Sequence, residues 1–254
     1  MKIINFVFFF FVSLFPVFTQ AQAQWQPKPL TTWQWQLTGT IDTTVKASVY
    51  NIDLFDAPQN TIDKLRSQGV KVICYFSAGS SENWRPDYNQ FPAVIKGKSN
   101  GWSGEKWLDI RRIDLLSVMT SRLDLALVKN CDGVEADNVD GYTNSTGFPL
   151  KYADQIKYNT WLASEAHLRG LSIGLKNDLD QVKDLVSVFD FAINEQCFQY
   201  KECDLLTPFI LQNKAVFGVE YKSKTSSFCP KANALKFSWL KKNLNLTAKR
   251  ESCL

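Results

Sequence analysis

The stretch DGVEADNVDGY, residues 132–142, places four acidic side chains in a run of Val, Ala and Gly that otherwise has the composition of a strand. The residues before it, DLLSVMTSRLDLALVKN, have helical spacing, and so do those after it, KYADQIKYNTWLASEAHLRG. A strand between two helices is the repeating unit of a parallel sheet. The stretch therefore predicts the fold class and also a strand that ends in carboxylates.

Similar apolar runs recur along the chain without strict alternation of polar and apolar residues, which is typical of strands covered on both faces. About seven or eight strand–helix units without a dividing linker favour a single (β/α)8 barrel. A doubly wound sheet is the alternative, but no Gly-x-Gly-x-x-Gly follows any run. The expected strands are 31–37, 47–55, 71–79, 131–142, 171–178, 189–198 and 214–221, with a long irregular region at 80–111 and a final helix within ANALKFSWLKKNL.

The first 23 residues have the layout of a secretory signal peptide: an early lysine, an apolar run, and the small residues of Ala21-Gln22-Ala23. Cleavage after Ala23 would leave one domain, residues 24–254, in a secreted or periplasmic protein. An uncleaved membrane anchor is the alternative. No later run is long enough to cross a bilayer, so no stable membrane insertion is expected.

Six cysteines follow the expected cleavage point, and an even number in an exported chain indicates disulfides. Fifteen pairings are possible. Spacing allows Cys197 to pair with Cys203 and Cys229 with Cys253, which leaves Cys74 and Cys131 either paired across neighbouring strands or buried as free thiols.

The net charge is modest, +4 for the chain. Its basic residues are scattered rather than gathered in a stripe, so we expect no nucleic-acid partner and a monomer. Asn144-Ser-Thr and Asn245-Leu-Thr are glycosylation sequons, which have meaning in a cell that glycosylates.

The chain has one histidine, His167, within a helical stretch, so a Ser-His-Asp triad and a histidine zinc site have nothing to build on. A calcium loop around Asn138 fails because Ala136 and Gly147 stand where acids are required. We therefore expect neither a metal nor a cofactor, and carboxylates remain as the chemistry-bearing groups.

In a (β/α)8 barrel, active residues lie at the carboxyl ends of the strands. Side chains two apart on a strand share a face, so Glu135 and Asp137 are both expected to point inward, with Asp137 nearer the mouth. Glu195 lies two strands further on, in an expected apolar wall of Phe191, Ile193 and Phe198. Two carboxylates suffice for glycoside hydrolysis, with Asp137 as nucleophile and Glu195 as acid and base.

Aromatic side chains in the region 80–111 support a sugar ligand. Trp84, Trp102 and Trp107 lie in it, and long insertions are commonly binding loops. The simpler interpretation for Trp107 is packing onto the core.

The chain resembles glycoside hydrolase family 114, the endo-α-1,4-polygalactosaminidase-like barrels, from about Trp33 to Cys253. The resemblance rests on the ordered blocks YNIDLFD, VICYFSAGSSENWRPD, WSGEKWLDIR, CDGVEADNVDGY, GLKND, NEQCFQYKEC and VFGVEY. It implies a retaining endo-glycosidase of galactosamine polymers, with Asp137 and Glu195 as the catalytic pair and a polysaccharide as partner. The residues expected to bind substrate along the cleft are Asp53, Tyr75, Glu135, Asn138, Asp140, Tyr142, Lys176, Asn177, Glu220 and Tyr221.

Two alternatives remain open from the sequence. One is a glycosidase of the same fold that cleaves another α-galactoside or an N-acetylated polymer, because loops set the substrate within such a barrel. The other is a secreted carbohydrate-binding protein that kept the cleft without catalysis.

Overall fold

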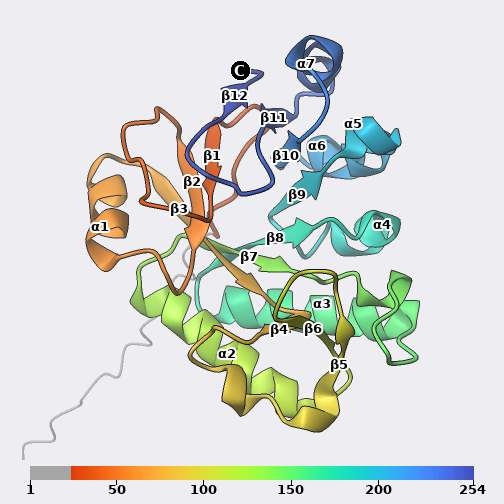
Figure 1. Ribbon diagram of the computed structural model, residues 1–254. Coiled ribbons are helices and arrows are strands. Elements are labelled where there is room, and N and C mark those ends of the chain that lie inside the picture. The colour runs from red at the N-terminus through yellow and green to blue at the C-terminus, as the bar shows by residue number, and fades with distance from the viewer. Residues whose placement is uncertain (1–23) are drawn as a thin grey trace, which may run out of the picture.

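The computed structural model describes residues 24–254, and the expected signal peptide, residues 1–23, lies outside them. Strands occupy the middle of the molecule and helices lie around them (Figure 1). The main sheet has the order β1-β2-β3-β7-β8-β9-β10-β11-β12. Its strands are β1 (Trp33–Gln36), β2 (Val49–Asp53), β3 (Lys71–Ser77), β7 (Gly133–Asp137), β8 (Ser172–Lys176), β9 (Phe191–Glu195), β10 (Val216–Glu220), β11 (Ser238–Lys241) and β12 (Glu251–Ser252).

All neighbours from β1 to β11 pair in parallel, and β12 adds to β11 in the antiparallel direction. Eight parallel strands, each of which after β2 is preceded by a helix, give the TIM-barrel-like α/β architecture that the sequence predicts. The helices are α1 (Gln59–Ser67), α2 (Ile113–Val128), α3 (Tyr152–Leu168), α4 (Val182–Leu185), α5 (Cys197–Tyr200), α6 (Thr207–Leu211) and α7 (Thr225–Ala234).

The apolar core has two layers, one outside the sheet and one inside it. The outer layer lies between the strands and the helices and includes Ile62 and Leu65 of α1. The inner layer fills the barrel with large side chains, among them Trp33, Phe191 and Phe217. The Trp33 ring contacts the Phe217 ring at 4.9 Å between centroids, so apolar packing closes the lower part of the barrel.

The segment after β11 joins the first and last parallel strands. The indole of Trp33 on β1 donates to the carbonyl of Ser238 on β11 at 2.9 Å. The segment that follows β11 contributes further bonds, because Leu37 N–H donates to the Leu246 carbonyl and the Gln34 amide donates to the Ala248 carbonyl. Side chains and this C-terminal segment therefore hold β1 beside β11.

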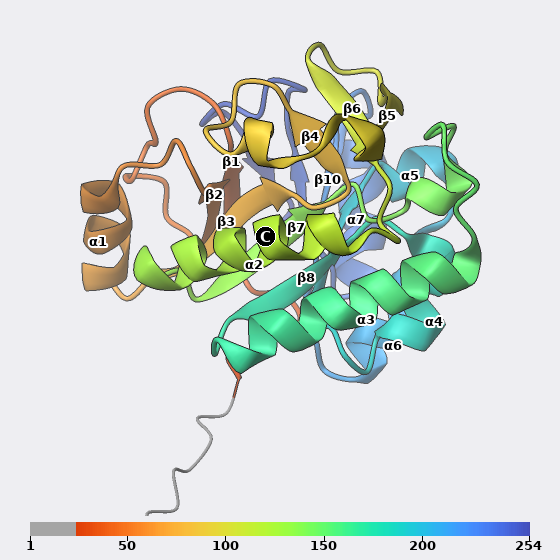
Figure 2. The same ribbon diagram turned by 90° about the horizontal axis from the view of Figure 1, so that it is seen from below.

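Two sequence predictions of structure are wrong. The region 80–111 is not irregular, because it forms a three-stranded antiparallel sheet of β4 (Ser80–Glu82), β5 (Lys96–Ser99) and β6 (Glu105–Leu108) that stands beside the barrel strands (Figure 2). The final helix within ANALKFSWLKKNL ends early: α7 stops at Ala234, Lys236 takes a positive φ of 60°, and the next residues form β11. A short run such as FSWLK is apolar enough for either element, so periodicity alone did not decide it.

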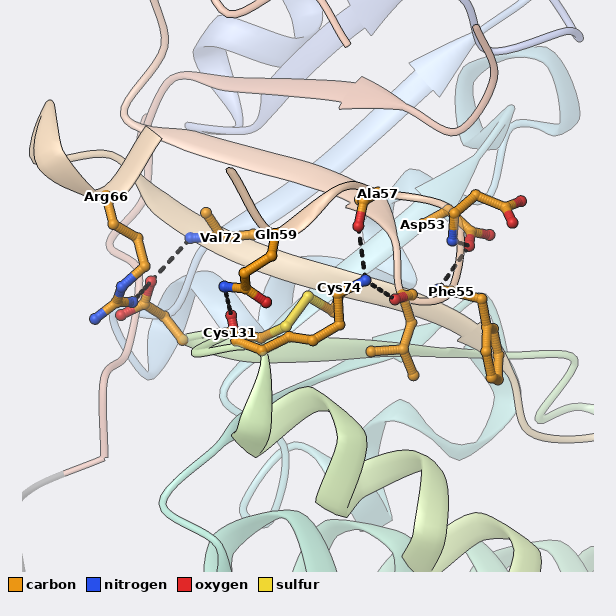
Figure 3. The surroundings of a disulfide bond; sticks show 12 residues. Asp53, Phe55, Ala57, Gln59, Arg66, Val72, Cys74 and Cys131 are labelled. Atoms are coloured by element: carbon orange, nitrogen blue, oxygen red, sulfur yellow. Dashed lines mark hydrogen bonds and ion pairs between the residues drawn. A yellow bond between two sulfur atoms is a disulfide. The ribbon is translucent and has the colours of Figure 1, made fainter. Parts of the chain in front are cut away.

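Three disulfides join Cys74 to Cys131, Cys197 to Cys203, and Cys229 to Cys253. Spacing allowed these pairs, and their presence excludes the free-thiol interpretation of Cys74 and Cys131. Figure 3 shows the first bridge, which joins Cys74 of β3 to Cys131, two residues before β7. The salt bridge of Arg66 with Asp132, the residue next to Cys131, lies close by. Asp132 also accepts from Val72 N–H, so this acid fixes the start of the strands, away from the cleft.

None of the helices in the described part of the chain has the length and apolar character needed to cross a bilayer.

Candidate active site

Lys176 lies at the centre of the barrel mouth and joins three carboxylates. It ends β8, and its side chain is 2% exposed. Its Nζ lies 3.0 Å from Oδ1 of Asp137, 3.1 Å from Oε2 of Glu195 and 3.3 Å from Oε1 of Glu135. Burial alone would lower the pKa of Lys176, but these three acids raise it well above its usual value, so the amine stays cationic.

Asp137 ends β7 and remains partly exposed, with 18% of its side chain accessible. The hydroxyl of Tyr75 donates to Oδ2 at 2.9 Å, and the backbone N–H of Asn138 donates to Oδ1 at 2.7 Å. Burial and the charge of Asp137 raise the pKa of Tyr75 well above its usual value, so the phenol keeps its proton and acts as a donor. These contacts fix both oxygens of Asp137 at the mouth.

Glu195 ends the next strand but one, β9, and 28% of its side chain is accessible. The Tyr221 hydroxyl donates to Oε1, and the backbone N–H of Glu195 donates to the Asn177 side chain at 3.0 Å. The apolar wall expected around this carboxyl is wrong: Ile193 lies below it on the inner face, while Phe198 packs outside the barrel against Phe228 and Trp239. Polar contacts therefore surround the carboxyl of Glu195.

Glu135 lies below Asp137 on the inner face of β7 and is fully buried. The Asn51 amide donates to its Oε2 at 2.5 Å. Burial raises the pKa of Glu135 to about 7, against the opposing effect of Lys176. Glu135 therefore lies beneath the cleft as a partner of Lys176, and not in the cleft lining where the sequence placed it.

Glu220 is likewise not in the cleft. Successive strand residues face opposite sides, so Glu220 and Tyr221 cannot both point inward. Tyr221 does, whereas Glu220 is fully buried on the outer side and accepts from Phe198 N–H at 3.0 Å. Glu220 therefore contacts the start of α5 and is absent from the lining of both cavities of the cleft.

A cleft of about 600 Å³ lies over the carboxylates, and a second cavity of about 490 Å³ adjoins it. Both are lined by Glu195 and Tyr221, together with Trp102 and Leu244. Of the remaining predicted residues, the first cavity holds Asp53, Tyr75, Asp137, Asn138 and Lys176, and the second holds Asp140, Tyr142 and Asn177.

Asp53 lines the cleft, but both oxygens of its carboxylate accept hydrogen bonds from other groups of the protein. Its carboxylate receives two hydrogen bonds from the Arg85 guanidinium, at 2.9 and 2.5 Å, and also accepts from two backbone N–H groups of the following loop. Arg85 in turn contacts Glu82 at 3.0 Å. Sequence reasoning missed Arg85 and Glu82, because it treated the region that carries them as a loop and paired no charge from it with a strand end.

Close backbone packing fixes the loops at the mouth. A Cβ on Gly79 would lie 1.7 Å from the carbonyl oxygen of Asn138, so only glycine fits between the loops after β3 and β7. Asn138, Asn177 and Gln196, each directly after a strand, have positive φ angles of 60°, 52° and 67°. Such backbone strain is common at functional sites and marks the ends of three strands of the barrel here.

The second cavity is strongly acidic. Burial and the charge of Asp137 raise the pKa of Asp140 to about 6, and burial raises that of Asp178 to about 8. Asp180 and Glu202 line the same cavity, and no Lys or Arg does. Within residues 24–254, no cluster of three or more His, Cys, Asp and Glu side chains is arranged to hold a metal ion.

The region 80–111 contributes aromatic side chains to the cleft, as expected from the sequence. Trp84 is 51% exposed and Trp102 is 60% exposed, and both line the first cavity. Trp107 is 7% exposed and is absent from the cleft lining, which bears out the packing interpretation for this residue.

A search of curated protein sequences finds no match. Among solved structures, Aspergillus fumigatus Ega3 in complex with galactosamine is 42% identical, with a TM-score of 0.87, over 92% of this chain and 100% of that one. The glycoside hydrolase domain of PelA from Pseudomonas aeruginosa is 11% identical, with a TM-score of 0.69, over 87% of this chain and 98% of that one, and shows the fold alone. The model of glycoside hydrolase family GH114 matches residues 16–254, and the chain is therefore a glycoside hydrolase that belongs to this family.

Proposed function

We propose that this protein is a secreted, endo-acting glycoside hydrolase that cleaves α-1,4-linked galactosamine polymers with retention of configuration, using Asp137 and Glu195. The observation that carries the proposal is the shared contact of both carboxylates with Lys176. The Nζ lies 3.0 Å from Asp137 and 3.1 Å from Glu195. Two acids on one cation at the open end of a barrel form the constellation that glycoside hydrolysis requires.

The shared contact with Lys176 limits the distance between one oxygen of Asp137 and one oxygen of Glu195. Because both oxygens contact the same Nζ of Lys176, at 3.0 and 3.1 Å, Oδ1 of Asp137 and Oε2 of Glu195 lie at most about 6.1 Å apart. Inverting enzymes need roughly 6.5 to 9.5 Å between the carboxyl groups to admit a water, whereas retaining enzymes have about 5 to 5.5 Å. The bound applies to this pair of oxygens, so retention is proposed from the family resemblance, and the anomer of the first product tests it.

In the proposed first step, an oxygen of Asp137 attacks the anomeric carbon while Glu195 donates a proton to the departing glycosidic oxygen. The carbon–oxygen bond to the leaving sugar breaks as the bond to Asp137 forms. In the second step, Glu195 takes a proton from water, whose oxygen attacks the same carbon and releases Asp137. Lys176 and Tyr75 hold Asp137 in place for both attacks, and Tyr221 holds Glu195.

A cationic substrate suits the charge of the cleft. The two cavities are lined by ten acidic residues and by two basic ones, Arg85 and Lys176, both of which are paired with carboxylates. A free amino group near these acids favours their ionised forms and gains charge-assisted hydrogen bonds. The galactosamine bound in the Ega3 structure, with 42% identity, agrees with this substrate class.

An endo-acting enzyme must hold sugar units on both sides of the bond that it cleaves. The two cavities share Glu195 and Tyr221 in their linings, so the space for sugar units continues past the proposed acid. Secretion is supported by the three disulfides, because such bridges persist in oxidising compartments.

Product analysis by mass spectrometry tests the proposal on two substrates, polygalactosamine and partly acetylated galactosaminogalactan. We expect galactosamine oligomers from both, with cleavage between unacetylated units. The release of N-acetylated oligomers alone would favour the second candidate, a glycosidase for an acetylated polymer. Binding without any product would favour a carbohydrate-binding protein. The anomer formed first, read by NMR, is expected to be α, and an initial β product would exclude retention.

A further inference from the structure

The second sequon, Asn245-Leu246-Thr247, lies in the wall of the proposed catalytic cleft. All three residues line the cavity over the carboxylates, and Asn245 also lines a further hollow together with Asn243 and Leu244. The sequence pattern alone gives an acceptor for an N-linked glycan. The structure adds where that glycan would stand.

Asn245 has the accessibility that such a modification requires. Its side chain and that of Thr247 are exposed, and both lie in a turn between β11 and β12 rather than in a strand. The backbone forms the turn, because Leu246 N–H donates to the Asn243 carbonyl. Glycosylated asparagines occupy surface loops of this kind.

The turn is attached firmly to the barrel. The Thr38 hydroxyl donates to the Asn245 carbonyl at 2.5 Å, and Leu37 N–H donates to the Leu246 carbonyl at 3.0 Å. From the other side, the Lys242 ammonium donates to the Thr247 carbonyl at 2.6 Å. The disulfide of Cys229 with Cys253 ties down the end of the segment. A group attached to Asn245 therefore stays beside the cleft and does not swing away with a mobile loop.

The first sequon differs in position. Asn144 follows the loop after β7 and is absent from the lining of both cavities of the cleft. Its amide donates to the Asp140 carbonyl at 3.1 Å, and Thr146 of the sequon is buried. The chain thus offers two acceptors of identical chemistry, one in the cleft wall and one outside it.

We propose that Asn245 is an N-glycosylation site and that its glycan narrows the entrance of the cleft, so that long polymers are admitted less readily than short oligosaccharides. A bulky hydrated glycan on the cleft wall occupies space near the entrance. A long polymer needs that space, because its chain continues beyond the sugars next to the cleaved bond. Short oligosaccharides occupy the cleft without reaching past that wall. The modification itself rests on the sequon and its place in the fold, whereas its kinetic effect rests on the proposed function.

The test uses the full chain secreted from a yeast that attaches N-glycans. The N144Q variant retains the Asn245 sequon alone, and mass spectrometry of its glycopeptides measures occupancy without any assay of activity. In a T247A variant the Asn245 glycan should be lost, and in T247S it should remain. If Asn245 of the secreted N144Q protein carries no glycan, the proposal is overturned. If the N144Q variant is not secreted, the same measurement is made on the wild type, and an unmodified Asn245 there overturns the proposal.

The kinetic effect is read by trimming the glycan of the folded N144Q protein enzymatically to its first sugar. We expect kcat/KM for long polygalactosamine to rise about threefold or more on trimming, with no change for a short galactosamine oligomer. Equal kcat/KM for the polymer before and after trimming would contradict the proposed narrowing. If the occupied protein cleaves neither substrate, trimmed or untrimmed, the proposed function fails while the glycosylation site stands.

Discussion

Lys176 Nζ lies 3.0 Å from Oδ1 of Asp137, and it lies at the same time within 3.3 Å of the fully buried Glu135 below. One ammonium group thus links the proposed nucleophile to an acid that water does not reach. The positive charge of Lys176 offsets the mutual repulsion of Glu135, Asp137 and Glu195, which all lie within 3.3 Å of its Nζ.

Replacement of Lys176 by Met should destabilise the protein by about 3 to 5 kcal/mol, because it leaves the buried Glu135 without its cation. The double variant K176M/E135Q removes the charge of that acid as well and should recover part of the loss. Urea unfolding of the wild type, K176M, E135Q and the double variant measures this coupling. A double variant no more stable than K176M would show that the two side chains do not depend on each other.

Asp178 should make stability depend on pH. Burial raises its pKa from 3.8 to about 8, so the folded protein holds this proton more tightly than the unfolded chain does. The stabilisation is complete below about pH 4 and is lost as the pH rises through about 8. D178N keeps an acceptor for the Asn159 amide, which donates to Asp178 at 2.9 Å, and should lack this loss.

Thermal unfolding of the wild type and D178N between pH 4 and 8.5 tests whether the ionisation of Asp178 lowers stability as the pH rises. We expect D178N to gain in melting temperature relative to the wild type as the pH rises. The control is D204N, which changes an exposed acid outside this cavity and should follow the wild-type profile. Parallel profiles for wild type and D178N would rule out Asp178 as the source.

The disulfides should differ in their contribution to stability. Loop-closure entropy predicts that the Cys74–Cys131 bridge, with a separation of 57 residues, contributes about 4 kcal/mol, and that the Cys197–Cys203 bridge, with a separation of 6, contributes about 2 kcal/mol. Denaturant unfolding of the two double Cys→Ala variants gives the order. A larger loss for the short loop would mean that its native contacts with α5, rather than chain entropy, dominate.

Trp102 should bind sugar without taking part in the bond cleavage. It is 60% exposed and lines both cavities, so W102A should fold normally and raise KM about fivefold to tenfold, with little change in kcat. Val94, on the same insertion and 70% exposed, is absent from the lining of both cavities, so V94A is the matched control. A W102A enzyme with an unchanged KM would remove the indole from the proposed binding surface.

The sequence was sufficient to predict the parallel strands and the convergence of Asp137, Lys176 and Glu195, because parallel strands bring their carboxyl ends to one side. It placed Glu135 deeper than Asp137 but could not predict that Glu135 is closed off from the cleft, because that depends on its contacts with Lys176 and Asn51 from other strands. It misplaced Glu220 because it assigned both Glu220 and Tyr221, at the end of β10, to the cleft, although only one of two adjacent strand residues can face inward.

The insertion 80–111 was the least predictable part, because its short strands pair with one another and carry no period of their own. Arg85 and Glu82 enter the site from this small sheet, and their contact with Asp53 depends on how the sheet stands over the barrel. No local pattern in the sequence contains that information.

The most direct measurement of the central claim is kcat/KM on polygalactosamine for the wild type and for the isosteric variants D137N and E195Q. Each variant removes one carboxylate and keeps the shape of the side chain, so its melting temperature should stay within a few degrees of the wild type. We expect kcat/KM to fall about 10³-fold or more in each, because nucleophile and acid are both required in the transition state. A folded variant of either kind that stays within tenfold of the wild type would contradict the assignment of the carboxylate pair.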